Sequence, residues 1–201
     1  VNSINFKYNL SIFYSTSKSY FYKLRIGYNI ARNKYNFSNL DNEIEAFDSQ
    51  KIINFNPSFG KILNFNKIEI CFGMELPFFI VNPYFYDEDY KTFRYPNGIK
   101  ELAINYKTTT KISGGYVIGL NSIICLKYHI NSHFVVLSEL SNGILNANFG
   151  KNISSETETI FSGSFFPINI PAQIESETIP YTYKKVYFSN AEISLGLGYK
   201  F

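Results

Sequence analysis

The C-terminal stretch from Lys185 to Phe201 alternates between two kinds of side chain, and this alternation limits the fold more than any other feature. One parity is mostly apolar and ends in aromatic residues, whereas the other is polar or small. The first set contains Tyr187, Ser189, Ala191, Ile193, Leu195, Leu197, Tyr199 and Phe201. A period of two puts the sets on opposite faces of a strand. An apolar outer face, a polar, glycine-rich inner face and a terminal aromatic residue are what a transmembrane β-barrel requires.

The last eight residues, SLGLGYKF, also resemble the C-terminal β-signal of bacterial outer-membrane proteins. The resemblance consists of a polar residue, a glycine two positions on, and spaced apolar or aromatic residues of which the last is the terminal Phe. The residues that carry it are Ser194, Gly196, Tyr199 and Phe201. It implies a small bacterial outer-membrane β-barrel protein of the eight-stranded type, inserted by the barrel-assembly machinery. The alternative is the last strand of a soluble β-sandwich.

The composition agrees with a barrel and argues against a nucleic-acid-binding protein. The chain is 45% hydrophobic and 18% aromatic, with 17 Tyr, 20 Phe and no Trp, which suits a surface with a lipid-facing middle and wet rims. No apolar run approaches the length of a membrane helix, but barrels lack such runs because alternate residues face the lumen. The net charge of +3 comes from interspersed charges, so we expect no nucleic-acid partner. We expect one domain, residues 1–201.

Six further segments alternate in the same way and pair as three hairpins. These segments are approximately residues 4–14, 20–30, 53–63, 68–78, 112–130 and 134–148. Short turns at about 15–19, 64–67 and 131–133 join the arms. Pro57 fits poorly within one arm, since proline removes a ladder donor and belongs at an edge or bulge. The disturbed alternation near Ile144 and Leu145 predicts a bulge.

Three long connections separate the hairpins, at about 33–50, 80–108 and 150–184. Outer-membrane barrels have short periplasmic turns and longer extracellular loops. The three long connections are therefore predicted to be extracellular loops.

The strand count gives seven, whereas bacterial single-chain barrels have an even number. Either a strand precedes Val1, or one lies within residues 90–110, where Leu102, Ile104, Tyr106 and Thr108 alternate. The predicted fold is all-β: a closed antiparallel up-and-down transmembrane β-barrel with eight strands.

Charged residues of both signs recur on the predicted inner face. They are Lys7, Lys23, Arg25, Glu69, Glu75, Lys127, Glu139 and Glu192. Charges inside a barrel must be paired or wet, and an eight-stranded barrel is only wide enough for side chains to fill it. The pattern predicts an ion-paired plug and no open pore. The alternative is the solvated face of a sandwich.

Few residues could act as catalytic groups or as ligands. His129 and His133 fall at or beside a predicted periplasmic turn, whereas barrel enzymes acting on lipid A and omptin-like proteases need His at the outer rim. We therefore expect no enzymatic activity, no cofactor and no metal. Cys71 and Cys125 lie on neighbouring strands, either as a disulfide or as two buried thiols. The tyrosines and acidic residues within 84–95 have two alternative roles. Either they bind a glycan, a protein or a cation, or they pack against one another within their own loop.

These features predict an integral outer-membrane barrel that acts as a structural or interaction subunit. Its partners would be outer-membrane lipid, the barrel-assembly machinery during insertion, and other envelope proteins. One alternative is a barrel that transports a small solute or acts on lipid. Another is a soluble lipocalin-like barrel, in which the apolar parity would point inward.

Overall fold

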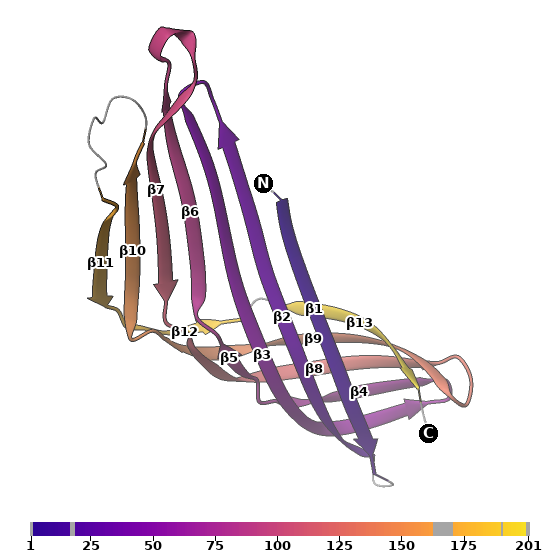
Figure 1. Cartoon of the computed structure of the whole chain (residues 1–201). Helices are drawn as coiled ribbons and strands as arrows, with labels where there is room; N and C mark the ends of the chain where they lie inside the picture. The colour runs from indigo at the N-terminus through magenta and orange to yellow at the C-terminus, as the bar shows by residue number, and fades with distance from the viewer. Residues whose placement is uncertain (1, 17–18, 163–170, 190, 200–201) are drawn as a thin grey trace.

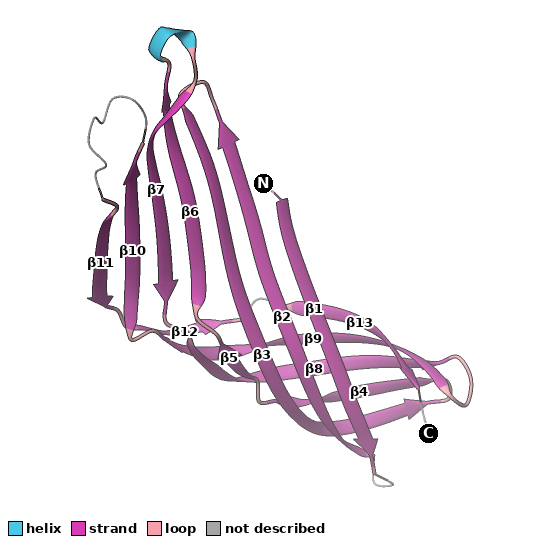
Figure 2. Cartoon of the chain, in the orientation of Figure 1, coloured by secondary structure: helices cyan, strands magenta, loops and turns pink. Residues whose placement is uncertain are grey.

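The computed structural model is an all-β chain in which the strands form one antiparallel sheet (Figure 1; Figure 2). It describes residues 2–16, 19–162, 171–189 and 191–199. The strands are β1 (Asn2–Ser15), β2 (Tyr20–Ser38), β3 (Asn42–Phe65), β4 (Ile68–Glu75), β5 (Phe78–Val81), β6 (Tyr84–Arg94), β7 (Glu101–Ile112), β8 (Gly115–His129), β9 (Phe134–Phe149), β10 (Asn152–Phe161), β11 (Gln173–Pro180), β12 (Tyr183–Phe188) and β13 (Glu192–Tyr199). One 3-10 turn occurs within these ranges, η1 (Pro96–Gly98), and it joins β6 to β7. No helix in the described ranges is long and apolar enough to cross a membrane.

The short strands follow one another along longer antiparallel paths. β4 and β5 pair with β3 in one register, in which Ser58 lies opposite Glu75 and Phe55 opposite Phe78. The interruption falls at Leu76 and Pro77, because proline has no N–H for the ladder. In the same way β6 continues β5, β8 continues β7, β10 continues β9, and β13 continues β11 and β12. The described residues thus form seven up-and-down passes, the number of alternating segments in the sequence.

The sheet bends where these passes are interrupted (Figure 1). On one side lies the polar extension, formed by β6, β7, β10, β11 and the adjoining parts of β2 and β3. On the other lies the amphipathic half, formed by β4, β5, β8, β9, β12, β13, β1 and the rest of β2 and β3. Gly150 sits at this boundary with a φ of +80°, and a Cβ there would lie 2.8 Å from the carbonyl oxygen of Tyr181. Only glycine adopts such a conformation without strain.

The three long connections predicted from the sequence are wrong, because most of their residues are strand. β2 continues to Ser38 and β3 begins at Asn42, and the Asn39 side chain caps the tight turn by accepting from the N–H groups of Asp41 and Asn42 at 3.0 and 2.7 Å. β6 pairs with β7, and β10 pairs with β7 and β11. Most of these segments are polar on both faces, so they lack the contrast that marks a strand in the sequence; β7, whose residues 102–108 alternate, is the exception. The alternation at 102–108 belongs to β7 and is not an additional pass.

The closure and strand count of the predicted barrel are not established by the pairing. β1 pairs only with β2, and β12 and β13 pair only with β9. Among the described residues no backbone ladder joins β1 to β13, so the sheet has free edges there.

Two details of the closing pass correct the sequence prediction. Phe188 lies opposite Ile144 in the β12 register, but Glu192 lies opposite Ser141 in the β13 register, which is a slip of one residue. Phe188 therefore shares the exposed apolar face, and Tyr187, predicted to face outward with Leu195, lies on the other face. The bulge predicted near Ile144 is also wrong, because β9 keeps one unbroken register with β8.

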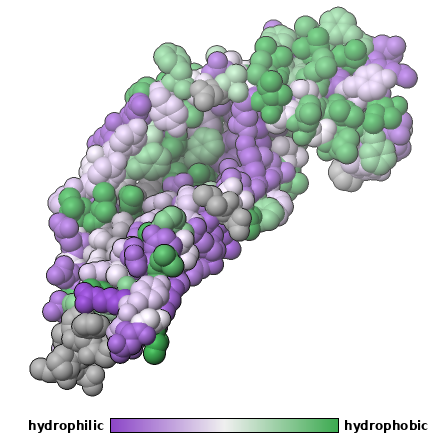
Figure 3. All heavy atoms as spheres, turned by 90° about the horizontal axis from the view of Figure 1, so that it is seen from above, coloured by the Kyte–Doolittle hydropathy of each residue, from purple (hydrophilic) through white to green (hydrophobic). Residues whose placement is uncertain are grey.

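Burial in the amphipathic half is inverted relative to a water-soluble protein. On its convex face apolar side chains are exposed, for example Ile124 at 54% and Leu195 at 80%. On its concave face Lys23 and Arg25 are 8% exposed and Glu75 is 0% exposed. The accessible surface of 13,474 Å² exceeds the roughly 9,700 Å² expected of a compact soluble chain of this mass. Figure 3 shows hydrophobic side chains crowded at one end of the molecule and hydrophilic ones prevailing at the other.

Candidate functional site in the concave face

Four buried charges meet on the concave face of the amphipathic half. The Nη2 group of Arg25 donates to both carboxylate oxygens of Glu75 at 2.6 and 2.8 Å, and Nη1 lies 3.1 Å from Glu139. The Nζ atom of Lys23 donates to the other Glu139 oxygen at 2.5 Å. We call Lys23, Arg25, Glu75 and Glu139 the charge quartet. Its two positive and two negative groups balance, which is the condition under which charges tolerate burial.

The strand pattern explains why these four side chains converge. Lys23 and Arg25 are two residues apart on β2, so both point to the same face. Glu75 ends β4 and Glu139 lies on β9, each at an inward position of its own strand. Residues far apart in the chain thus meet because every strand presents its polar parity to the concave side.

A second ion-paired group lies toward the β8–β9 turn. Glu69 contacts Lys127 at 3.6 Å and the Nε2 atom of His129 at 2.9 Å. The Lys127 ammonium also lies 2.9 Å from the centroid of the Phe13 ring, a cation–π arrangement. His129, placed by the sequence beside a turn, is therefore a partner of a predicted inner-face carboxylate.

The third pair, Lys7 with Glu192, joins the two free edges of the sheet. A close ion pair links Lys7 on β1 to Glu192 on β13. Both side chains are about half exposed, at 49% and 47%. With this pair, each of the eight charged residues predicted for the inner face has an ion-pair partner within that set.

An apolar layer lies next to the quartet. Phe21, Ile62, Cys71, Ile123 and Cys125 form a buried cluster. The Phe21 ring stacks on Phe13, with ring centroids 5.2 Å apart, and covers Gly60, where a Cβ would lie 2.7 Å from the ring. Side chains therefore fill the concave face from this layer through the quartet.

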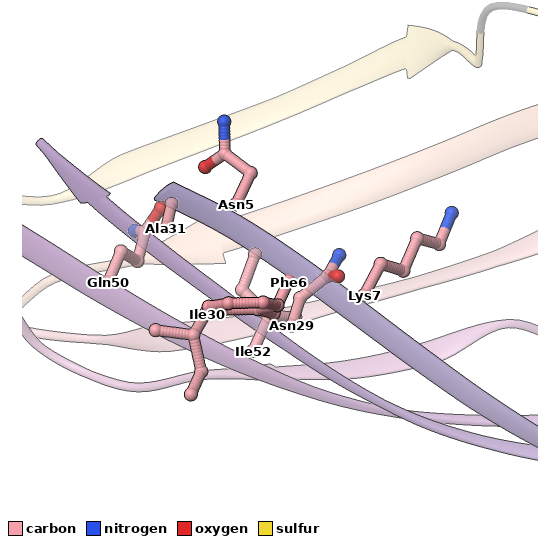
Figure 4. A pocket seen from close by; sticks show the side chains of 8 residues that line it. All are labelled: Asn5, Phe6, Lys7, Asn29, Ile30, Ala31, Gln50 and Ile52. Atoms are coloured by element: carbon pink, nitrogen blue, oxygen red, sulfur yellow. The ribbon is translucent and has the colours of Figure 1, made fainter. Parts of the chain in front are cut away.

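On the other side of the quartet the concave face is open. A hollow of about 250 Å³ lies beside the β1 edge, lined by Asn5, Phe6, Lys7, Asn29, Ile30, Ala31, Gln50 and Ile52. Asn5 and Lys7 project from the same side of β1 (Figure 4). The polar lining consists of amides and one ammonium group. This lining offers hydrogen bonds but no nucleophile paired with a base.

The remaining predicted residues lie apart from the quartet. Ser194, Gly196 and Tyr199 lie on β13, whereas Phe201 is outside the described residues. His133 contacts the Ser132 hydroxyl at 2.7 Å in the exposed β8–β9 turn. No group of three or more His, Cys, Asp or Glu among the described residues is placed to hold a metal ion.

A polar cluster lies on the extension; sequence reasoning missed Asn33, Tyr35 and Asp48, whereas it singled out the tyrosines and acids within 84–95. Asp48 is buried and accepts from the amide of Asn33 at 2.8 Å and the hydroxyl of Tyr35 at 3.2 Å. In β6 the Tyr86 hydroxyl donates to Glu88 at 2.6 Å, and this bond, with burial, raises the pKa of Tyr86 to about 12. The spacing of Tyr84, Tyr86 and Glu88 at every second residue was a usable signal of a strand.

A comparison with models of known protein families found no match, and a comparison with curated proteins found no significant relative.

Proposed function

We propose that this chain is an integral β-barrel of the bacterial outer membrane, with a side-chain-filled interior and a structural or interaction role. The observation that carries the proposal is the inverted burial of the amphipathic half, where exposed apolar residues surround a buried charge quartet. In water such a surface would aggregate, whereas in a bilayer it contacts lipid tails.

The dimensions of the apolar face suit a bilayer. On β8 the outward residues run from Tyr116 to Tyr128, with Ile118, Leu120, Ser122, Ile124 and Leu126 between them, of which only Ser122 is polar. Twelve residue steps span about 41 Å along a strand, or about 31 Å across the membrane at a tilt of about 40°. The hydrocarbon core of a bilayer is about 30 Å thick, and tyrosines at both ends match the interfacial aromatic girdles.

We propose that an eighth strand closes the barrel between β1 and β13. Backbone groups left unpaired at these edges would cost several kcal/mol each in lipid. Because β1 is the first and β13 belongs to the last of seven antiparallel passes, the two strands run in the same direction. A single strand of opposite direction can therefore pair antiparallel with both, whereas two copies in one membrane could meet only in parallel. The Lys7–Glu192 pair would lie at this seam.

The interior proposed here blocks passage. The charge quartet and the apolar layer of Phe21 and Ile123 cross the concave face, and an eight-stranded barrel has little further room. The polar extension then becomes the part outside the bilayer that is available to other envelope proteins. We therefore propose a membrane-anchored scaffold in place of a transporter.

The proposal is tested by cell fractionation and gel mobility. The chain is expected in outer-membrane fractions, soluble only in detergent, with a gel mobility that changes on heating. Recovery as a soluble protein without detergent would reject the membrane role. Purified protein in a planar bilayer should give no steady single-channel steps, and their appearance would reject the filled interior.

A further inference from the structure

The two cysteines lie directly opposite each other on adjacent strands. Cys71 on β4 is the register partner of Cys125 on β8. Both side chains belong to the apolar layer, at 0% and 5% exposure, and both thiols are free. The sequence alone left open whether these residues pair or only fill space.

The backbone hydrogen bonds on either side of the two cysteines show whether they form a hydrogen-bonded or a non-hydrogen-bonded pair. The N–H of His129 donates to the carbonyl of Lys67, and the N–H of Gly119 donates to that of Pro77. Hydrogen-bonded pairs recur at every second residue of an antiparallel ladder, so Cys71 and Cys125 also form a hydrogen-bonded pair. In such pairs the Cα atoms are about 5.5 Å apart, within the range of about 4.4–6.8 Å found for disulfides. In a hydrogen-bonded pair the Cβ atoms lie near the upper end of the range of about 4.5–5.5 Å, whereas disulfides have about 3.5–4.5 Å, so the bond requires β4 and β8 to approach each other locally by about 1 Å.

We infer that Cys71 and Cys125 are a disulfide-forming pair that is oxidised in the mature protein. The inference rests on the proposed function, because the route to the outer membrane passes through an oxidising compartment. One thiolate attacks the disulfide of a thiol–disulfide oxidoreductase, and the second displaces the oxidoreductase from the mixed disulfide. The Sγ–Sγ bond forms, two protons and two electrons leave the cysteines, and the oxidoreductase is reduced to a dithiol. The bond forms before strand closure, since an oxidant cannot reach a buried Cys71 afterwards.

Thiol counting in the denatured protein tests the inference. Protein from outer-membrane fractions is unfolded in the presence of a maleimide that adds mass to each free thiol. Wild-type protein is expected to gain no label without reductant and two labels after reduction. The Cys71→Ser and Cys125→Ser variants should each gain one label in both conditions, which calibrates the gel shift. Two labels on unreduced wild-type protein, or a disulfide-linked dimer, would overturn the pairing.

A second experiment tests the cysteine pairing independently of the membrane proposal. The reduced chain is refolded into detergent micelles in a buffer of oxidised and reduced glutathione, and its thiols are counted in the same way. No free thiol is the expected result, whatever the cellular location of the protein. Two free thiols would reject the pairing. The membrane proposal would be unaffected by that result, because cell fractionation tests it separately.

Discussion

Neutralising Glu75 should destabilise the folded chain strongly, because its charge is buried and balanced. The Glu75→Gln substitution keeps the shape of the side chain but removes the charge that Arg25 contacts at 2.6 and 2.8 Å. The quartet then carries a net positive charge beside side chains that exclude water. Breaking a buried ion pair in this way typically costs about 3–5 kcal/mol of unfolding free energy.

The chain provides a matched control for this prediction. Glu192→Gln makes the same chemical change in the Lys7–Glu192 pair, whose side chains are about half exposed. Exposed pairs contribute about 0–1 kcal/mol. The Arg25→Met/Glu75→Gln double variant leaves Lys23 balanced by Glu139, so it should regain much of the stability lost by the single variant.

Urea unfolding in detergent micelles measures these differences. Tyrosine fluorescence is the natural probe, since the chain has 17 Tyr and no Trp, and gel mobility of unheated samples gives an independent folded fraction. If Glu75→Gln and Glu192→Gln cost the same small amount, the quartet is hydrated and the filled interior is wrong.

Three further predictions concern the convex face, the extension and the strand packing. If the convex face contacts lipid as proposed, Ile124→Arg should destabilise the folded chain in lipid vesicles by about 2–4 kcal/mol. Thr109→Lys on the exposed side of the extension should change the unfolding free energy little, and unfolding in lipid vesicles compares the two variants. Tyr86 should ionise near pH 12 instead of near 10.0. Its contribution to the unfolding free energy is therefore present below about pH 10 and lost as the pH rises to about 12. Ultraviolet titration of tyrosinate measures the pKa, and Glu88→Gln should lower the midpoint. At Gly73 a Cβ would lie 2.1 Å from a backbone carbonyl oxygen of β3. Gly73→Ala should therefore lower the unfolding free energy by about 1–3 kcal/mol. A urea unfolding curve that matches the wild type would contradict this prediction.

The sequence allowed prediction of the strands whose faces differ. Segments such as 4–14 and 112–130 alternate between lipid-like and polar residues, and the structure has β1 and β8 there. The short turns near 64–67 and 131–133 are also present, because two apolar-periodic arms flank each one.

Most of the strands that sequence reasoning missed are polar on both faces. In β10 and β11 the residues are mostly Ser, Thr and Glu, a composition typical of loops, and only their cross-strand partners reveal them as sheet. The one-residue slip before Glu192 was also hidden, because Tyr187 and Phe188 are both aromatic and the alternation does not show which of them faces outward. Ion-pair partners such as Arg25 with Glu75 depend on register between distant strands, which a single sequence does not specify.

The continuity of β3 has a mechanical consequence. Its 24 residues, about 80 Å at about 3.3 Å per residue, carry the polypeptide without a break from the extension to the far turn. A force applied near Asn42 would thus be transmitted along one continuous strand through the bend of the sheet. In the proposed membrane arrangement, a protein bound to that tip could tilt the whole molecule without entering the lipid itself.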